Sequence, residues 1–241
     1  MIIKVLAYSS SVILVLRLSC VMQSSSSSQD PSDTHRIYYT KTELRNLIIH
    51  HVLIMLASRT FKDDQAHTQP LYTFTEANYN SIISTQSNTT LDDSDSFQVT
   101  TNNNQTYHIK IIDIKLGNIT RSSPVYSFLN DNINDKKIII APDFTDKAER
   151  DLDTFNCRIF FTAQMTHNIM QHKLQPTFTA YSGNEAARIL LEIGASANTL
   201  PPLSYHDAAA KYYDFKKGDI VRIKDDSTNT AVRISYKVVL D

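Results

Sequence analysis

The pattern near the C-terminus of the chain narrows its possible folds more than any other stretch. Residues 220–223 and 232–238 alternate apolar with polar side chains, as half-buried β-strands do. The polar stretch between them, residues 224–230, is typical of a hairpin connection. Ahead of the hairpin, residues 208–213 favour a short helix, and Asp207 can accept a hydrogen bond from one of its free backbone N–H groups. The pattern therefore predicts a small α+β unit, in which a hairpin follows a helix.

A second helix is predicted upstream of this unit. Residues 186–193 are amphipathic, and Gly194 follows them, where helices commonly end. Ser182 and Glu185 have the spacing of a capping box, in which each side chain accepts a hydrogen bond from the backbone N–H of the other residue. Further back, residues 136–140 fit a buried strand.

The clearest helix of the N-terminal half is predicted at residues 42–58, whose apolar side chains recur on one face. Thr40 or Thr42 can cap its N-terminus. His50 and His51 are adjacent, but neighbouring helical residues point about 100° apart and no carboxylate stands at a suitable offset. We therefore expect a structural role for both histidines rather than metal binding.

One enzymatic alternative comes from a predicted strand at residues 107–115. Asp113 and Lys115, at its end, imitate the Asp-x-Lys arrangement of metal-dependent nucleases, in which carboxylates hold Mg²⁺ and the lysine helps to activate water. The acidic residues that would complete such a site are Glu43, Asp92, Asp93 and Asp95. An isolated Asp-x-Lys is common, however, and the polar segment 63–106 that holds the three aspartates is predicted to form long loops. We favour a solvated strand edge, with a Mg-dependent nuclease as the alternative.

Composition limits the class of protein. With 241 residues, of which 41% are apolar and 20% charged, the chain can bury a core and form one or two domains. A formal net charge of −1 disfavours a DNA-binding protein that acts alone, although a subunit with one small basic surface remains compatible with it. Two cysteines, Cys20 and Cys157, cannot form a disulfide framework and have no metal-ligand neighbours, which favours a reducing compartment. No cofactor or metal is expected.

The N-terminus has some features of a signal peptide, because an apolar stretch at residues 12–16 follows Lys4. Arg17 interrupts this stretch, which is also too short to span a membrane. In the favoured interpretation Met22 is the working start, and residues 1–34 are a leader that is disordered or not part of the working protein.

A secreted glycoprotein is the second alternative. It would use the Asn-x-Thr triplets that begin at Asn88, Asn104 and Asn118 as glycosylation acceptors. These triplets lie in a region rich in Asn and Thr, where composition alone produces them.

Residue by residue, the C-terminal part resembles the fifth subunit shared by the nuclear RNA polymerases and its archaeal RNA polymerase counterpart. That family has a Leu-Pro-Arg-Ile strand, an Asp-Pro-x-Ala-Arg-Tyr helix, a Gly-Leu-Lys-x-Gly turn, a Val-Val-Lys-Ile strand and a closing Tyr-Arg-Leu-Val. The positions in register are Leu200, Pro201, Asp207, Ala209, Lys211 (for Arg), Tyr212, Lys216, Gly218, Val221, Arg222 (for Lys), Ile223 and Tyr236.

The resemblance continues upstream with less specificity. Residues 172–178 match the family's His-x-Leu-x-Pro-x-His except at Phe178, and residues 144–148 stand where the family has Met-Thr-Pro-Ser-Ala. The match is close over residues 166–241 and weaker over 105–165. The loop 224–230 loses the family's Arg-Pro pair and its Glu, so the partner contacts of that loop are not carried over.

The resemblance implies an α+β protein with a nuclease-like α/β jaw domain at residues 35–165 and a small assembly domain at 166–241. It implies a non-catalytic subunit of a DNA-directed RNA polymerase that docks on the largest subunit, contacts other subunits and lies near downstream duplex DNA. No membrane and no small-molecule substrate are expected. The expected location is the nucleus, or a cytoplasmic viral factory or virion if a virus encodes the chain.

The same resemblance suggests which residues act. The expected subunit-interface residues are His172, Pro176, Leu200, Pro201, Asp207, Lys211, Tyr212, Gly218, Arg222 and Tyr236. Proline and aromatic side chains would give a rigid surface, because they lose little conformational entropy on association. Lys211 and Arg222 would form polar pairs at its rim. Thr145 and Lys147 are expected near DNA, where phosphate contacts would position the duplex without reading its sequence.

Overall fold

The structure, a computed structural model, describes residues 39–62, 67–87, 96–121, 123, 125–131, 135–226 and 232–241. By their contacts these residues belong to one unit, residues 39–241. Several predictions fall outside the described residues: the leader at 1–34 with Cys20 and Met22, the acceptor Asn88, and Asp92, Asp93 and Asp95.

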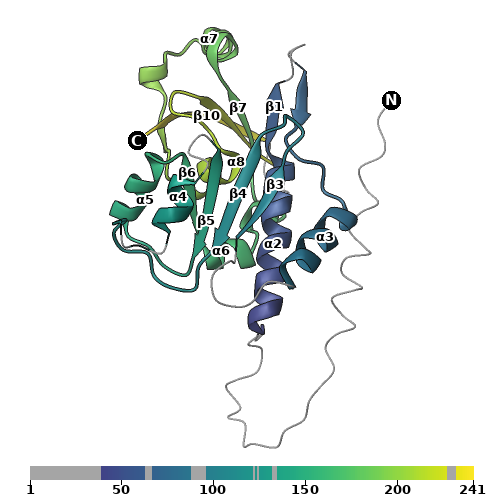
Figure 1. Ribbon diagram of the computed structural model, residues 1–241. Coiled ribbons are helices and arrows are strands. Elements are labelled where there is room, and N and C mark those ends of the chain that lie inside the picture. The colour runs from purple at the N-terminus through teal and green to yellow at the C-terminus, as the bar shows by residue number, and fades with distance from the viewer. Residues whose placement is uncertain are drawn as a thin grey trace, which may run out of the picture. The chain divides into compact units, whose positions relative to one another are not determined.

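The N-terminal sheet has four strands in the order β3 (Ser96–Thr100), β4 (Thr106–Ile111), β5 (Lys136–Ala141) and β6 (Cys157–Phe161). β3 runs antiparallel to β4, whereas β4, β5 and β6 are parallel (Figure 1). Parallel strands covered on both faces have nearly continuous apolar sequences. The isoleucines of β5 confirm the buried strand predicted at residues 136–140.

Successive residues of β5 face two different cores. Ile138 and Ile140 pack in the core that includes α2 (Lys41–Ser58), and Ile139 packs with α4 (Tyr126–Asn130) and α5 (Asp146–Asp153). This alternation follows from the two-residue period of a strand. The sheet is therefore covered by helices on both faces.

Helix α2 begins as predicted. The Thr40 hydroxyl accepts a hydrogen bond from the Glu43 N–H at 3.2 Å, and the Glu43 carboxylate accepts one from the Thr40 N–H at 2.9 Å. Together these bonds form a capping box, which satisfies backbone donors that have no partner within the helix.

Two predictions in the N-terminal half were wrong. The segment 63–106, expected to form long loops, contains α3 (Glu76–Ser87) and β3. Only Tyr79, Ile82 and Ile83 of α3 pack against the core, so its apolar face is narrow and its helical period is weak. The strand predicted at 107–115 ends at Ile111, so Asp113 and Lys115 lie beyond the sheet.

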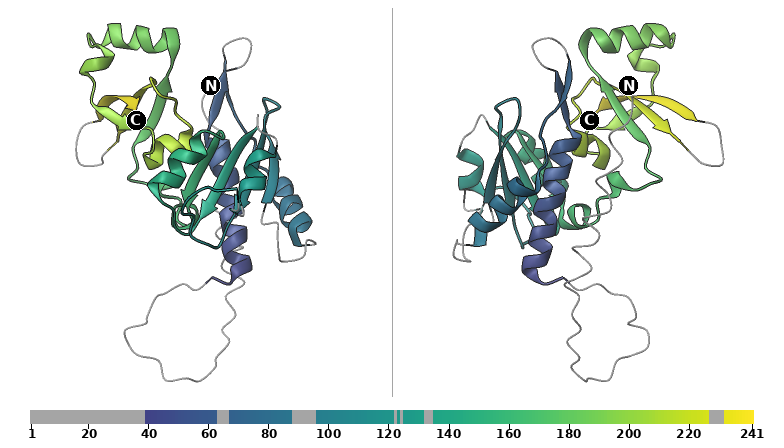
Figure 2. Two further views of the ribbon diagram at one scale, coloured as in Figure 1. Left: turned by 60° about the vertical axis from the view of Figure 1, so that its left-hand side comes forward. Right: turned by 90° about the vertical axis from the view of Figure 1, so that its right-hand side faces the viewer.

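The C-terminal sheet has the order β7 (Thr177–Tyr181), β9 (Ile220–Asp225), β10 (Arg233–Leu240) and β8 (Pro202–Ser204). β9 and β10 are the predicted antiparallel hairpin, and residues 227–231 of its loop lie outside the described part. β8 runs parallel to β10. In the right-hand view of Figure 2 the yellow hairpin extends away from the teal N-terminal sheet.

Both predicted C-terminal helices are present. α8 (Ala208–Tyr213) is capped by Asp207, whose carboxylate accepts a hydrogen bond from the Ala209 N–H at 2.8 Å. α7 (Gly183–Glu192) ends as predicted at Gly194, which has φ +63°. The helices and the two mixed sheets give the α+β fold class that was predicted.

The capping box predicted at Ser182 and Glu185 was wrong. Ser182 is the N-cap of α7, but its side chain makes no capping hydrogen bond. The Glu185 carboxylate instead pairs with Lys62 Nζ at 2.5 Å. A lysine from a distant part of the chain therefore takes the carboxylate that the local pattern assigned to the cap.

The remaining short elements are β1 (Thr60–Lys62), β2 (Thr68–Pro70), α6 (Thr162–Thr166) and the 3₁₀ turns η1 (Ile169–Gln171) and η2 (Ala197–Thr199). Within the described part of the chain, no helix is both long and apolar enough to cross a membrane.

The end of α7 provides a test of the fold. We expect Gly194→Ala to lower the free energy of unfolding by about 1 kcal/mol, because alanine is strained at positive φ. Gly117→Ala is the control, since a Cβ there has open space and Gly117 is not among the positive-φ residues. Urea unfolding measures both variants. Equal losses in the two would contradict this account of the helix end.

Candidate subunit interface

The C-terminal sheet has one covered face and one face that is partly open. On the covered face, Val221 and Val239 pack against α8. On the opposite face, Thr179, Arg222 and Tyr236 are aligned across three strands. We call this second face the outer face, and define it by Thr179, Arg222, Ile234 and Tyr236.

Helix α7 covers only one end of the outer face. Its Ala186 and Ile189 pack against Ile220 and Val238. Toward the hairpin loop the face is open, and Ile234 is 45% exposed. An exposed apolar side chain beside an aromatic and an arginine has the composition typical of the centre of protein interfaces.

Arg222 has an unsatisfied hydrogen-bond donor. Its Nε is buried but has no hydrogen-bond acceptor among the described residues. A buried donor without an acceptor costs about 1–3 kcal/mol.

The structure brings together four of the predicted interface residues. Leu200 and Tyr236 pack in the same cluster next to α7, and Tyr236 is directly across from Arg222. Pro201 adjoins them, because its carbonyl accepts a hydrogen bond from the Val238 N–H at 3.1 Å.

Four predicted residues lie on other segments. His172 is exposed, and its Nδ1 accepts a hydrogen bond from the Leu174 N–H at 3.2 Å. Pro176 comes directly before β7, and Asp207 caps α8. Gly218 is in the turn before β9, where φ is +91°.

Lys211 and Tyr212 require a correction, because the chain itself buries them. Their exposed fractions are 4% and 5%, too small for the direct partner contacts that were expected. Lys211 Nζ pairs with Glu149 Oε1 of α5 at 2.8 Å. The Tyr212 hydroxyl accepts a hydrogen bond from Asn168 Nδ2 at 3.3 Å. Tyr212 also packs in the core cluster that includes α2 and the N-terminal sheet. Both residues therefore join the C-terminal part to the rest of the chain.

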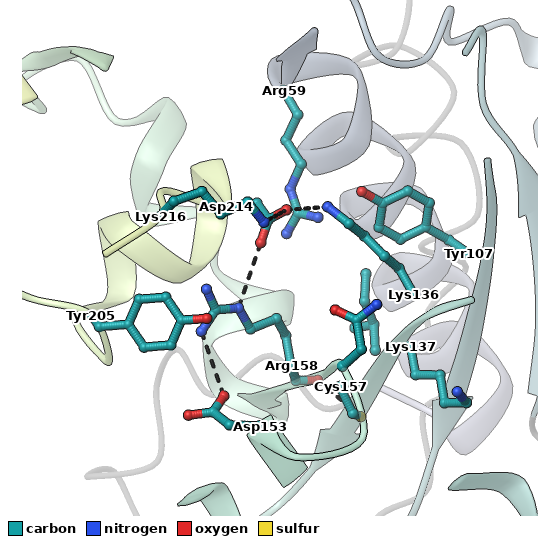
Figure 3. Close-up of a pocket in the computed structure, with 12 residues that line it drawn as sticks. Arg59, Tyr107, Lys136, Lys137, Asp153, Cys157, Arg158, Tyr205, Asp214 and Lys216 are labelled. Carbon is teal, nitrogen blue, oxygen red and sulfur yellow. Dashed lines mark hydrogen bonds and ion pairs between the residues drawn. The ribbon is translucent and has the colours of Figure 1, made fainter. Parts of the chain in front are cut away.

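An ionic junction between the C-terminal part and the N-terminal sheet centres on Asp214 (Figure 3). Asp214 ends α8 in the left-handed conformation, with φ 56°. Its Oδ2 pairs with Lys136 Nζ of β5 at 2.5 Å, and its Oδ1 is 3.5 Å from Arg158 Nε of β6. We call Arg59, Lys136, Arg158 and Asp214 the polar joint.

The charge of Asp214 depends on the surrounding cations. Burial alone raises the pKa of this carboxyl, but the positive charges of Arg59 and Lys136 outweigh burial. The net effect holds the pKa of Asp214 well below its ordinary value. Asp214 is therefore ionised at neutral pH.

Arg59 completes the joint from the end of α2. It donates hydrogen bonds from Nε to the Tyr212 carbonyl at 2.9 Å and from Nη2 to the Lys211 carbonyl at 3.0 Å. These carbonyls are at the C-terminus of α8, where the helix dipole favours a cation. The role of Arg59 was not predicted from the sequence, because no local pattern distinguishes it from a surface arginine.

Of the two residues expected near DNA, Lys147 is free to contact a phosphate, whereas the hydroxyl of Thr145 is used within the chain. The Thr145 hydroxyl accepts a hydrogen bond from the Ala148 N–H at 3.2 Å and donates one to the Gly117 carbonyl at 2.8 Å. Thr145 therefore serves as the N-cap of α5. Lys147, in the first turn of α5, is exposed.

Asp113 and Lys115 do not form a shared site. Asp113 pairs with Lys41 at 2.6 Å, and Lys115 pairs with Asp143 at 2.5 Å. All four side chains are exposed. Among the described residues, no group of three or more His, Cys, Asp or Glu side chains is placed to hold a metal ion.

The remaining candidate groups have structural surroundings. His51 Nδ1 is 2.6 Å from the Met165 carbonyl, and the His50 ring contacts Phe74 and Tyr79 edge-on. Burial lowers the pKa of both histidines. Burial raises the pKa of the Cys157 thiol, which keeps it protonated and unreactive.

Comparisons with known proteins identify the family. Residues 167–239 match the family model "RNA polymerase Rpb5, C-terminal domain". Over 77 residues the chain is 34% identical to DNA-directed RNA polymerase subunit Rpo5 of Methanosphaera stadtmanae, covering 32% of this chain and 100% of that protein. The chain belongs to the RNA polymerase subunit 5 family.

Longer relatives extend the similarity beyond the C-terminal part. DNA-directed RNA polymerase subunit 5 of Acanthamoeba polyphaga mimivirus is 27% identical over 209 residues, or 85% of this chain and 96% of the relative. Subunit RPABC1 of RNA polymerases I, II and III of Caenorhabditis elegans is 24% identical over 132 residues, or 53% of this chain and 63% of the relative. These matches confirm the resemblance on which the sequence analysis relied.

The polar joint of this subunit 5 family member predicts a pH-dependent stability. Because folding lowers the pKa of Asp214, its stabilising contribution is present above the unfolded pKa of about 3.9 and is lost as the pH falls through the folded value. At pH 7, Asp214→Asn should lower the free energy of unfolding by about 3–5 kcal/mol, because it leaves buried cations unpaired. The difference in the free energy of unfolding between the wild-type protein and Asp214→Asn should become smaller below about pH 4. Urea unfolding at several pH values measures it.

The matched control is Asp241→Asn, which removes an exposed carboxylate paired with Lys217. Asparagine tolerates the left-handed conformation at 214, so the backbone is preserved there. A gap between the wild-type protein and Asp214→Asn that stayed constant from pH 7 to pH 3 would contradict the ionic role of Asp214.

Proposed function

We propose that this subunit 5 family member is a non-catalytic subunit that docks on the largest subunit of a DNA-directed RNA polymerase. In this proposal residues 166–241 are the assembly domain and residues 35–165 are a jaw domain near downstream duplex DNA. Other polymerase subunits complete its partners. It needs no cofactor or small-molecule substrate.

The outer face of the C-terminal sheet is the observation that carries this proposal. It combines an exposed apolar side chain, Ile234, with the buried and unsatisfied Nε of Arg222. It also lies within residues 167–239, the segment that matches the family model. We therefore propose that Arg222, Ile234 and Tyr236 contact the largest subunit, with Leu200 and Pro201 beside them.

Through the polar joint, docking of the assembly domain would also hold the jaw domain in place. Asp214 and its cations connect the end of α8 to the N-terminal sheet. When the assembly domain is anchored, the jaw domain is held with it. The function of Lys211 and Tyr212 in this proposal is to keep the two parts together.

The proposed contact with DNA relies on Lys147, because the hydroxyl of Thr145 is already used within the chain. A lysine contacts phosphate without reading the base sequence. The net charge of −1 fits a subunit that meets DNA only when the polymerase holds the duplex.

The location of the chain would follow its polymerase. One relative is named for the nuclear enzymes RNA polymerases I, II and III, and another comes from a virus. We propose a nuclear location for a cellular protein, and a viral factory or virion for a viral one.

Docking can be tested with two matched substitutions of exposed isoleucines. Ile234→Asp should reduce co-purification with the largest subunit at least tenfold, because it places an unpaired carboxylate at the proposed contact. Ile114→Asp is the control, since Ile114 is 54% exposed and lies beyond β4, outside the C-terminal sheet. Quantitative mass spectrometry after affinity purification measures both. Equal loss in the two variants, or no loss in either, would refute docking through the outer face.

The DNA contact can be tested in the assembled polymerase. Lys147→Gln should reduce the slope of log affinity against log salt by about one, because one phosphate contact is lost. The binding of downstream duplex DNA at several salt concentrations gives this slope. Lys217→Gln, in the C-terminal part, should leave it unchanged. An unchanged slope for Lys147→Gln would show that Lys147 does not contact DNA phosphate.

A further inference from the structure

A small cavity lies beside the polar joint and has an unusual excess of positive charge. Its volume is about 40 Å³. The cationic residues that line it are Arg59, Lys136, Lys137, Arg158 and Lys216. Asp153 and Asp214 are the acidic residues in its lining. Figure 3 shows these residues gathered from β5, β6, the ends of α2 and α5, and the segment after α8.

Arg158 lines this cavity and has an unsatisfied donor. The residue is only 9% exposed, and its Nη1 has no hydrogen-bond partner among the described residues. The nearest carboxylate oxygen paired with Nη1, Asp153 Oδ1, is 3.7 Å away, which is beyond hydrogen-bond range. The guanidinium is stacked 3.8 Å from the centre of the Tyr205 ring. Arg158 is therefore held in place, and its Nη1 has an ion pair with Asp153 but no hydrogen bond.

The carboxylates of the lining do not balance the cations. Asp214 is shared by Lys136, Arg158 and Lys216. Asp153 pairs with Arg158, and burial raises the pKa of its carboxyl. Two of the cations are partly engaged elsewhere: Arg59 binds backbone carbonyls, and Lys137 Nζ donates to the Asp135 carbonyl. Lys136, Arg158 and Lys216 share the carboxylate of Asp214, and Asp153 is the other acidic residue of the lining.

We propose that this cavity binds a small inorganic oxyanion of the size of phosphate. One water needs about 10–15 Å³ of such volume, so 40 Å³ has room for roughly three water-sized groups and excludes a nucleoside. Arg158 Nη1 donates to the anion, and Lys136 and Lys216 supply charge. Arginine is suited to this role, because its planar guanidinium matches oxyanion geometry.

The anion would stabilise the junction between the two sheets. It would neutralise cations that β5, β6 and the segment after α8 bring together. This inference is independent of the docking proposal, because it concerns the isolated chain. A ligand that binds only the folded protein stabilises it in proportion to the logarithm of its concentration above Kd.

Calorimetric titration of the full chain with inorganic phosphate, at constant ionic strength in a chloride buffer, tests the proposal. We expect saturable binding at one site. Lys216→Gln should weaken it about tenfold, because one charge near the anion is lost. Lys216 is exposed, so its substitution should not unfold the protein. Lys217→Gln is the matched control, since the neighbouring lysine pairs with Asp241 and is not part of the lining.

Three outcomes would overturn the proposal. The first is no saturable heat with phosphate. The second is equal binding by the two lysine variants, which would indicate the general stabilising effect of phosphate and not a site. The third is binding of ATP but not of inorganic phosphate, which would assign the cavity to the phosphate group of a larger molecule.

Discussion

The ion pairs of Asp214 with Lys136 and Arg158 are the interaction on which the arrangement of this polymerase subunit depends. They connect the end of α8 to neighbouring strands of the N-terminal sheet. Charges removed from water are stable only when they are paired and hydrogen-bonded, so the removal of one partner is far more costly than the loss of a surface pair. Arg59 adds a second link by binding the last carbonyls of α8. Together these contacts make two separate sheets behave as parts of one subunit.

Some polar side chains are used in contacts within the chain and others are not, and this difference indicates which surface is available for the proposed partner. Lys211, Tyr212 and Asp214 are used inside the chain, and so is the Thr145 hydroxyl. The outer face of the C-terminal sheet keeps an exposed isoleucine and an arginine donor without an acceptor. Lys211, which stands at a charged position of the family pattern, is therefore used inside the chain, and its helix α8 covers the face of the sheet opposite the proposed docking surface.

The sequence predicted the features whose cause is local. The Thr40 cap, the Asp207 cap and the alternation of the β9–β10 hairpin each depend on residues close together in the chain. Prediction from the sequence failed where a side chain pairs with a residue far away in the chain. Lys62 takes the Glu185 carboxylate from across 123 positions, and Lys211 reaches Glu149 across 62 positions. Arg59 bonds to Tyr212 across 153 positions, and no local period indicates such a pair. Family resemblance identified the C-terminal part, but did not distinguish buried from exposed positions within it.

Hydrogen–deuterium exchange of the chain, free and within its polymerase, tests most directly the claim that the C-terminal sheet is the anchor. β7 is an edge strand, and the start of β10 lies at the open end of the outer face, so the amides of both report on a covering partner. The account predicts that assembly slows amide exchange at residues 177–181 and 232–236. It predicts a much smaller effect on amide exchange in the N-terminal strands β3 to β6. Slowed exchange confined to β3 to β6, with residues 177–181 and 232–236 unchanged, would contradict it.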